Sequence, residues 1–182
     1  MEYSVSTTIL RVRLIIMLKA VKDLVTSEHD LTRGNHRVEY TEVNGHYTAN
    51  FWYFQTIICS VDFHDETFKT NNGGWDTPST NRAIKDYRDF YNSNGYSEVF
   101  DSPERLKEYL VSLPENKSCR VYFDHKQVTL KKVVNKLIEG LKVAHLTVCS
   151  EESILYDDSY SYKGPKSFES FINEVLFNIL LS

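Results

Sequence analysis

The 182-residue sequence predicts an α+β fold, in which an antiparallel sheet is flanked by amphipathic helices. Three patterns lead to this class. Apolar residues recur at helical spacing in some segments, aromatic and β-branched residues are dense or alternate in others, and turn residues separate the two kinds. The apolar fraction of 41% and the charged fraction of 25% are typical of a globular protein that can bury a sizeable core.

An amphipathic helix is predicted for residues 8–25, followed by a polar loop over residues 27–35. Apolar residues alternate with other residues in the first half of this segment, so a strand is the alternative to a helix there. The apolar segment 14–18 is too short to span a bilayer, so no transmembrane or targeting segment is expected. The predicted apolar stripe consists of Leu10, Leu14, Met17, Leu18, Val21, Leu24 and Val25.

An antiparallel sheet is predicted next. Residues 37–43 alternate and lead into Asn44-Gly45, the strongest hairpin signal in the chain. Residues 46–62 are dense in aromatic and β-branched side chains and predict one long strand, or two strands separated by a bend near Gln55. A turn at His64-Asp65 leads into a last strand over residues 67–70.

A turn at Gly73-Gly74-Trp75 connects this sheet to a helix. The glycine pair allows a backbone path that other residues resist, and Ser79 or Thr80 is the expected N-cap. The break at residues 92–95 ends the helix. The helix is predicted to face inward with Ala83, Ile84, Tyr87 and Tyr91, and outward with Arg82, Lys85, Asp86 and Asp89.

The same polar break divides the sequence into a lobe of residues 1–95 (helix, antiparallel sheet and helix) and an α/β lobe of residues 96–182. One continuous domain is the alternative. In the second lobe, Asp101 or Ser102 and Pro103 mark a helix start. The expected elements are a helix over 103–113, a strand over 119–123, a helix over 129–141, a strand over 143–149, a Tyr-rich loop over 156–164 and a helix over 167–181.

No motif in the sequence indicates a catalytic centre, a metal or a cofactor, and none of these is expected. The six histidines stand alone, and the three cysteines are too far apart for a metal or disulfide pattern, which favours reduced thiols in a cytosolic protein. Asp62, Asp65, Glu66 and Lys69 faintly resemble a nuclease cluster but straddle a predicted turn. The net charge of −4 argues against a polycation that binds nucleic acid as a whole.

Two surfaces are candidates for binding. The first lies at the Gly-Gly-Trp turn, with Trp75, Asp76, Arg82 and Lys85 as the predicted partner-binding residues and with exposed aromatic residues of the hairpins beside them, because Trp, Tyr and Arg dominate binding hot spots. Trp75 could instead only fix the following helix. The second is a basic face of the helix over 129–141, which could track nucleic-acid phosphates or simply be its solvated side. That face consists of Lys131, Lys132, Lys136 and Lys142.

The segments FKTNNGGW (68–75) and DTPSTNRAI (76–84) resemble small phage and mobile-element proteins, in which a strand ends in a Gly-Trp turn, a Thr-rich cap and an Arg-containing helix start. The resemblance covers residues 50–94. Asp76 stands where that pattern commonly has Arg or Gln, and Ser79 where it has Thr.

Together with the chain's size and its Asn-, Lys- and Tyr-rich composition, this segment resembles type II-A anti-CRISPR proteins of low-GC gut bacteria or their phages. The resemblance implies a non-enzymatic inhibitor in the bacterial cytoplasm that binds guide-loaded Cas9 and blocks target-DNA binding or cleavage. The alternative is a phage-encoded nucleic-acid-binding accessory or regulatory protein.

Overall fold

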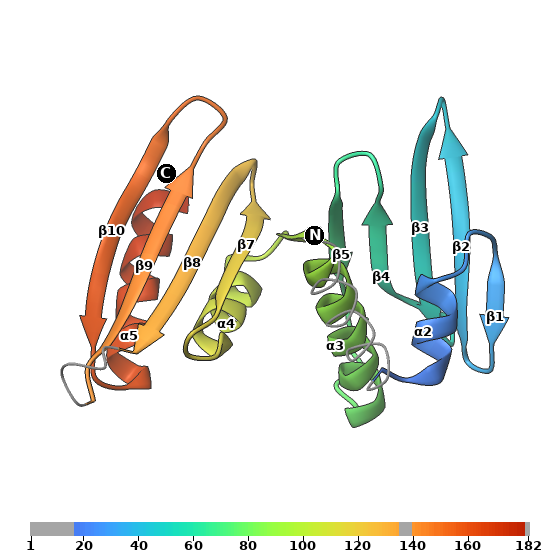
Figure 1. Cartoon of the computed structure of the whole chain (residues 1–182), viewed down its shortest axis with the longest axis horizontal. Coiled ribbons are helices and arrows are strands. Elements are labelled where there is room, and N and C mark those ends of the chain that lie inside the picture. Colours follow the sequence, from blue (N-terminus) through green and yellow to red (C-terminus); the bar gives the residue numbers. More distant parts are fainter. Residues whose placement is uncertain (1–16, 135–139, 181–182) are drawn as a thin grey trace, which may run out of the picture. The chain divides into compact units, whose positions relative to one another are not determined.

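A computed structural model describes residues 17–134 and 140–180 of the chain. The α+β class is confirmed. The chain divides into two compact units, Met1–Glu98 and Val99–Ser182, each with strands and helices of its own (Figure 1). No helix in the described part is long and apolar enough to cross a membrane.

The first unit is a sheet whose strands follow one another in chain order. Neighbouring strands from β1 to β5 pair antiparallel, and β6 pairs parallel to β5 after the chain has passed through a helix. The elements are α2 (Lys19–Val25), β1 (Leu31–Arg33), β2 (His36–Val43), β3 (His46–Tyr53), β4 (Thr56–Asp62), β5 (Thr67–Thr70), α3 (Pro78–Ser93) and the first half of β6 (Ser97–Phe100), a strand whose Val99 and Phe100 belong to the second unit.

The core of the first unit lies between this sheet and helices α2 and α3. Alternate strand residues point inward, as expected for a sheet with one covered face. The ring of Phe51 packs against that of Tyr87 with 4.8 Å between centroids. The fully buried side chains of this core include Val21, Leu24, Phe51, Ile58, Phe68, Ala83 and Tyr87.

Most of the predicted elements of the first unit are present. Asn44-Gly45 forms the hairpin turn with positive φ angles of 55° and 81°. Residues 46–62 form two strands that meet at Gln55. The predicted loop 27–35 is wrong in part, because β1 lies within it and pairs with β2. The N-terminal helix begins at Lys19, and residues 8–16 of the prediction lie outside the described residues.

Two details predicted for α3 are wrong. Thr77 is the N-cap, and its Oγ1 accepts a hydrogen bond from the backbone N–H of Thr80. Pro78 occupies the first turn, so the helix starts earlier than the sequence suggested. Asp86 is buried rather than outward, because its Oδ2 accepts a hydrogen bond from the backbone N–H of Leu18 at 2.8 Å. The predicted inward residues are buried.

The second unit is an antiparallel meander, covered on one face by two helices. Leu106 and Leu110 from one helix and Phe168 and Ile172 from the other meet Leu146 and the other inward strand residues in one core. The elements are α4 (Pro103–Ser112), β7 (Ser118–Phe123), β8 (Lys126–Val134), β9 (Lys142–Cys149), β10 (Ile154–Tyr162), α5 (Pro165–Val175) and the π-helical turn η1 (Leu176–Leu180).

The helix predicted over residues 129–141 is wrong. Residues 126–134 form β8, which pairs with β7 on one side and β9 on the other. Asp124 and His125 make the tight turn before it, with φ angles of 46° and 58°. Apolar residues that fit a period of 3.6 also fit a strand whose inward side carries Val128, Leu130 and Lys132. Residues 135–139 lie outside the described residues.

The Tyr-rich loop predicted over residues 156–164 is also wrong. These residues belong largely to β10, where Tyr156, Tyr160 and Tyr162 lie on one side of the strand and are partly or fully buried, while Asp158 on the same side is exposed. Tyr160 stacks on Phe171 with ring centroids 4.3 Å apart, and Tyr162 packs on Phe168 at 4.8 Å. Polar residues between the tyrosines obscured this alternation. The last predicted helix is present, but it starts at Pro165 and changes to η1 at Leu176.

Lys132 is buried in the second unit, with only 3% of its surface exposed. Its Nζ donates to the carbonyl oxygens of Val111 (2.9 Å) and Leu113 (2.6 Å) at the end of α4, and it lies 4.2 Å from the centre of the Phe168 ring. Burial lowers the pKa of Lys132. This lysine therefore satisfies carbonyl groups that a helix end leaves without partners.

Lys132→Met is expected to lower the free energy of unfolding by about 2–3 kcal/mol, because it leaves two carbonyl groups without their charged donor. Lys131→Met is the matched control. Lys131 is exposed on the other face of β8, and its loss should change stability by less than about 0.5 kcal/mol. Urea unfolding followed by circular dichroism measures both, and equal effects of the two substitutions would refute the structural role of Lys132.

Candidate partner-binding site

The turn between β5 and α3 is built by two asparagine side chains. The Oδ1 of Asn71 accepts the backbone N–H of Gly73 at 2.9 Å, and the Oδ1 of Asn72 accepts that of Gly74 at 3.1 Å. The Trp75 N–H donates to the Asn72 carbonyl at 2.9 Å. Such local bonds are why asparagine and glycine are favoured in turns. They fix the backbone from which the Trp75 side chain projects.

Gly73 brings this turn into direct contact with the start of β4. It has a φ of +59°, and a Cβ atom built on it would lie 2.4 Å from Cγ2 of Thr56. Only glycine fits both this conformation and this approach. Gly74 also has a positive φ, +82°, but a Cβ there would meet nothing within 4 Å. The two glycines therefore have different roles.

The first turn of α3 supplies a group of hydroxyls beside Trp75. Thr77 Oγ1 lies 2.8 Å from Thr80 Oγ1 and 3.2 Å from Ser79 Oγ. Asp76 is turned to Asn81, whose side-chain nitrogen donates to its Oδ1 at 2.6 Å. The hydroxyls bond mainly to one another and to the helix end, so this part of the surface is polar but uncharged.

Tyr53 is the last residue of β3, and Phe54 begins the turn between β3 and β4. Phe54 has a φ of +52°, a conformation that is rare for a bulky side chain, and its N–H donates to the Asn35 carbonyl at 2.7 Å. Its ring meets that of Tyr53 edge to face at 4.7 Å. As a result 58% of Phe54 remains exposed. Backbone strain of this kind is found preferentially at binding sites.

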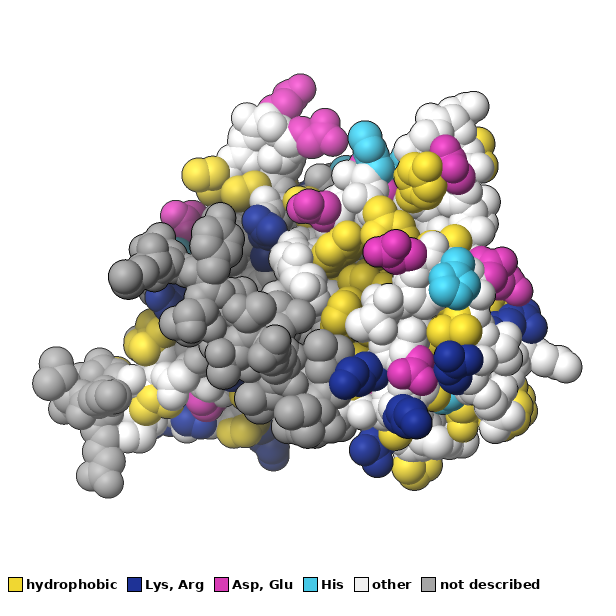
Figure 2. Space-filling model, turned by 45° about the vertical axis from the view of Figure 1, so that its right-hand side comes forward, with side chains coloured by type: hydrophobic (Ala, Val, Ile, Leu, Met, Phe, Trp, Pro, Cys, Tyr) yellow, Lys and Arg dark blue, Asp and Glu magenta, His cyan; other side chains and the backbone are white. Residues whose placement is uncertain are grey.

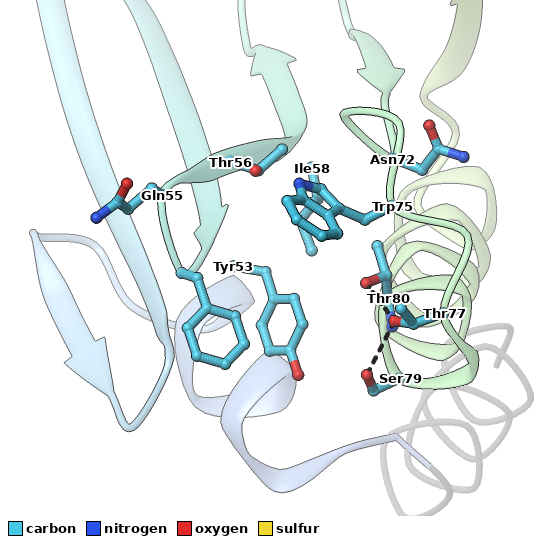
Figure 3. Close-up of a pocket in the computed structure, with 10 residues that line it drawn as sticks. Tyr53, Gln55, Thr56, Ile58, Asn72, Trp75, Thr77, Ser79 and Thr80 are labelled. Carbon is cyan, nitrogen blue, oxygen red and sulfur yellow. Dashed lines mark hydrogen bonds between the residues drawn. The ribbon is translucent and has the colours of Figure 1, made fainter.

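These segments line an open hollow of about 750 Å³, here called the Trp75 hollow. Figure 3 shows Tyr53 at the end of β3 and Trp75 in the turn before α3, and both line the hollow together with Ile58. The size is in the range of ligand pockets. The hollow is lined by Tyr53, Phe54, Gln55, Thr56, Ile58, Asn72, Trp75, Thr77, Ser79 and Thr80.

Of the four predicted partner-binding residues, Trp75 lines the hollow and the other three do not. Arg82 is exposed on α3 and makes no ion pair among the described residues. Lys85 is paired with Asp89 one turn later, and Asp76 is held by Asn81. Sequence reasoning expected exposed hairpin aromatics beside Trp75 but did not name Tyr53, Phe54 or Thr56. The one available signal was the pair of aromatic residues directly before the bend predicted at Gln55.

The predicted basic helix face is not formed. Lys132 is buried, Lys131 is exposed on β8, and Lys142 on β9 forms an ion pair with Glu115 at 3.1 Å. Lys136 lies outside the described residues. Strand β8 points Lys131 and Lys132 to opposite faces of the sheet, because successive side chains of a strand alternate. These lysines therefore do not line one phosphate-binding surface.

The described residues contain no group of three or more metal-ligating side chains that could hold a metal ion. Asp62, from the predicted acidic cluster, hydrogen-bonds to His46 Nε2 at 2.6 Å and accepts the backbone N–H groups of His64 and Asp65. The two backbone hydrogen bonds are typical of a tight turn. Desolvation by itself would raise the pKa of Asp62, but these hydrogen bonds and the contact with His46 hold that pKa below its usual value. All three cysteines are free thiols.

A serine, a histidine and an aspartate also lie in line on the second unit. His145 Nδ1 is 2.8 Å from Ser159 Oγ, and its Nε2 is 3.1 Å from Asp157 Oδ1, which also accepts the hydroxyl of Thr147. These residues are cross-strand neighbours on β9 and β10, and His145 and Asp157 are about half exposed. We interpret them as a cross-strand polar ladder, the ordinary contact between such neighbours.

No protein-family model, no curated protein and no solved structure matches this chain.

Proposed function

We propose that this protein is a non-catalytic binding protein, which takes up part of a partner protein in the Trp75 hollow. One observation carries the proposal. Trp75 and Phe54, with 63% and 58% of their surfaces exposed, line the same hollow. Large aromatic side chains that are exposed together, and held there by a glycine turn and a strained backbone, are typical of binding sites.

The energetics favour this use of the site. Covering an exposed aromatic side chain contributes about 25 cal/mol for each Å² of apolar surface removed from water. Tryptophan and tyrosine dominate binding hot spots because they combine a large apolar area with a hydrogen-bonding group. Other exposed hydrophobic residues, such as Tyr47 and Val43, do not line this hollow. Hydrophobic side chains reach the surface among charged ones in Figure 2.

The partner we propose is the guide-loaded Cas9 effector. The support is the resemblance of residues 50–94 to phage proteins, together with a net charge of −4, which suits a basic DNA channel. Binding there would prevent target-DNA engagement without any chemical step, in the cytoplasm of the bacterial host. The alternative, a nucleic-acid-binding accessory protein, was based on a basic helix face, and residues 126–134 form strand β8 instead of that helix.

Trp75→Ala is expected to weaken inhibition of Cas9 cleavage by at least about tenfold, as for a hot-spot residue. It should leave the melting temperature nearly unchanged, because most of the side chain is already in water. The measurement is DNA cleavage by purified Cas9 and guide with increasing inhibitor. Tyr47→Ala is the matched control, since Tyr47 is also an exposed aromatic residue of the first unit and lies outside the hollow.

Two results would contradict the proposal. Undiminished cleavage at a several-fold molar excess of the native protein, across several type II-A effectors, would remove Cas9 as the partner. A large fall in melting temperature with Trp75→Ala would show that Trp75 mainly fixes α3. Arg82→Glu tests whether the partner contacts only the hollow or a wider surface that includes α3. It should spare the fold and reduce inhibition only if the partner also covers the exposed face of α3.

A further inference from the structure

We infer that the Trp75 hollow accepts an extended, proline-containing segment of its partner. This inference rests on the proposed function, because it assumes that the hollow binds protein. It does not depend on which protein the partner is. Three properties of the described lining residues select this class of ligand: their lack of charge, their aromatic surfaces and two hydrogen-bond donors that have no partner among the described residues.

Among the described residues, the lining of the hollow carries no charged side chain. All ten residues around the hollow are aromatic, aliphatic, amide or hydroxyl residues. The nearest charged group in the turn, Asp76, is held by Asn81. Placing an ion of either sign in such a site would cost desolvation without a compensating partner. The part of the ligand that enters the hollow is therefore neutral.

Two of the aromatic residues, Trp75 and Tyr53, offer hydrogen-bond donors. The indole N–H of Trp75 and the hydroxyl of Tyr53 have no hydrogen-bond partner among the described residues, whereas the hydroxyls of Thr77 and Thr80 are bonded to each other. Figure 3 shows Tyr53 and Trp75 on the two sides of the hollow. A ligand with free carbonyl groups and few N–H groups complements these donors.

Proline in an extended left-handed helix has these properties. It has no N–H, its ring is apolar, and the conformation leaves every carbonyl without an internal partner. Proline-rich segments dock in aromatic-lined grooves and lose little conformational entropy because they are already ordered. An α-helical ligand is a poorer match, because its carbonyls are already used within the helix.

The test uses the full chain with Trp52→Phe, which leaves Trp75 as the one tryptophan. A blocked oligoproline peptide is titrated in, with a Gly-Ser peptide of equal length as control, and the Trp75 emission is followed. A saturable change with oligoproline is expected, and none with the control peptide. Tyr53→Phe keeps the ring and removes the hydroxyl donor, so it should weaken oligoproline binding several-fold without altering the melting temperature.

The outcomes separate the inference from the proposed function. No saturable response to oligoproline in a protein that still inhibits Cas9 through Trp75 would overturn the inference and leave the proposed function standing. An equal response to the Gly-Ser peptide, or a stronger response to an amphipathic helical peptide of equal length, would also overturn it. Oligoproline binding that is unaffected by Tyr53→Phe and by Phe54→Ala would place the peptide outside the hollow and count against it.

Discussion

Replacing Arg88 by methionine is expected to destabilise the first unit by about 3–5 kcal/mol, because it leaves a buried carboxylate without its partner. The Arg88 guanidinium donates to both oxygens of Glu98, Nε to Oε2 at 2.6 Å and Nη2 to Oε1 at 2.7 Å. Glu98 is 1% exposed, and the hydroxyl of Thr70 donates to its Oε1 at 2.6 Å. Such bidentate hydrogen bonds between arginine and a carboxylate are among the strongest in proteins.

The same helix supplies the control. Lys85 and Asp89 also form an ion pair on α3, but 70% and 51% of their side chains are exposed. Lys85→Met should change stability by less than about 1 kcal/mol. Urea unfolding followed by tryptophan fluorescence reports on this unit alone, since both tryptophans, Trp52 and Trp75, belong to it.

A double substitution tests the cause. Arg88→Met with Glu98→Met removes both charges, and a buried ion pair replaced by apolar residues is often neutral in stability. Most of the lost stability should therefore return in the double variant. If Arg88→Met were no more harmful than Lys85→Met, the pair would not be an important constraint on α3.

This ion pair matters for the candidate site because it fixes a helix that borders the Trp75 hollow. Thr77, Ser79 and Thr80 belong to the cap and first turn of α3, and Arg88 anchors the same helix to Glu98 of β6. With Tyr87 packed on Phe51, the helix is tied to the sheet at several points. If a partner binds in the hollow as proposed, a helix tied in this way reduces the cost of ordering this wall on binding.

Local chemistry in the sequence was sufficient for much of this fold. Asn44-Gly45 predicted its hairpin because two successive positive φ angles favour those residues. Pro103, after a serine cap, placed the start of α4 correctly. In both cases the determining interactions lie within a few residues of one another, so a single sequence contains them.

The errors arise where pairing across the sheet overrides local periodicity. Val133 and Val134 continue a helical stripe from Leu130, but their β-branched side chains also suit β8, which β7 and β9 pair on both sides. Lys132 looked like a residue of a solvated face. Lys132 points inward because its side chain bonds to the end of α4, more than eighteen residues earlier in the chain. Local sequence patterns do not contain this contact.

The candidate site shows the same limit. Trp75 could be predicted as a candidate site residue because the glycine pair before it is locally unusual. Tyr53 and Phe54 could not, because nothing in their own segment indicates that the turn between β3 and β4 meets the turn before α3. Gly73 and Thr56 make the contact that joins these turns. They are distant in sequence, so their proximity can be seen only in the folded structure.

Gly73→Ala is expected to destabilise the first unit by about 2–4 kcal/mol and to weaken partner binding. A left-handed conformation costs a residue with a Cβ roughly 1–2 kcal/mol. The new Cβ would also lie 2.4 Å from Thr56 Cγ2, and relieving such an overlap costs about 1–3 kcal/mol more. Relief requires the turn to move away from β4, and Trp75 follows two residues later, so the Trp75 hollow should change shape.

Gly74→Ala separates the two contributions, because Gly74 has the same backbone constraint and open space around it. It should show only the conformational cost, roughly 1–2 kcal/mol, and retain most of the binding. Thr56→Ser removes the Cγ2 atom, so adding it to Gly73→Ala should restore part of the stability and of the Trp75-dependent binding. Urea unfolding and the Cas9 cleavage assay measure the two effects. Equal losses from both glycine substitutions, with no recovery from Thr56→Ser, would mean that the contact with Thr56 does not position Trp75.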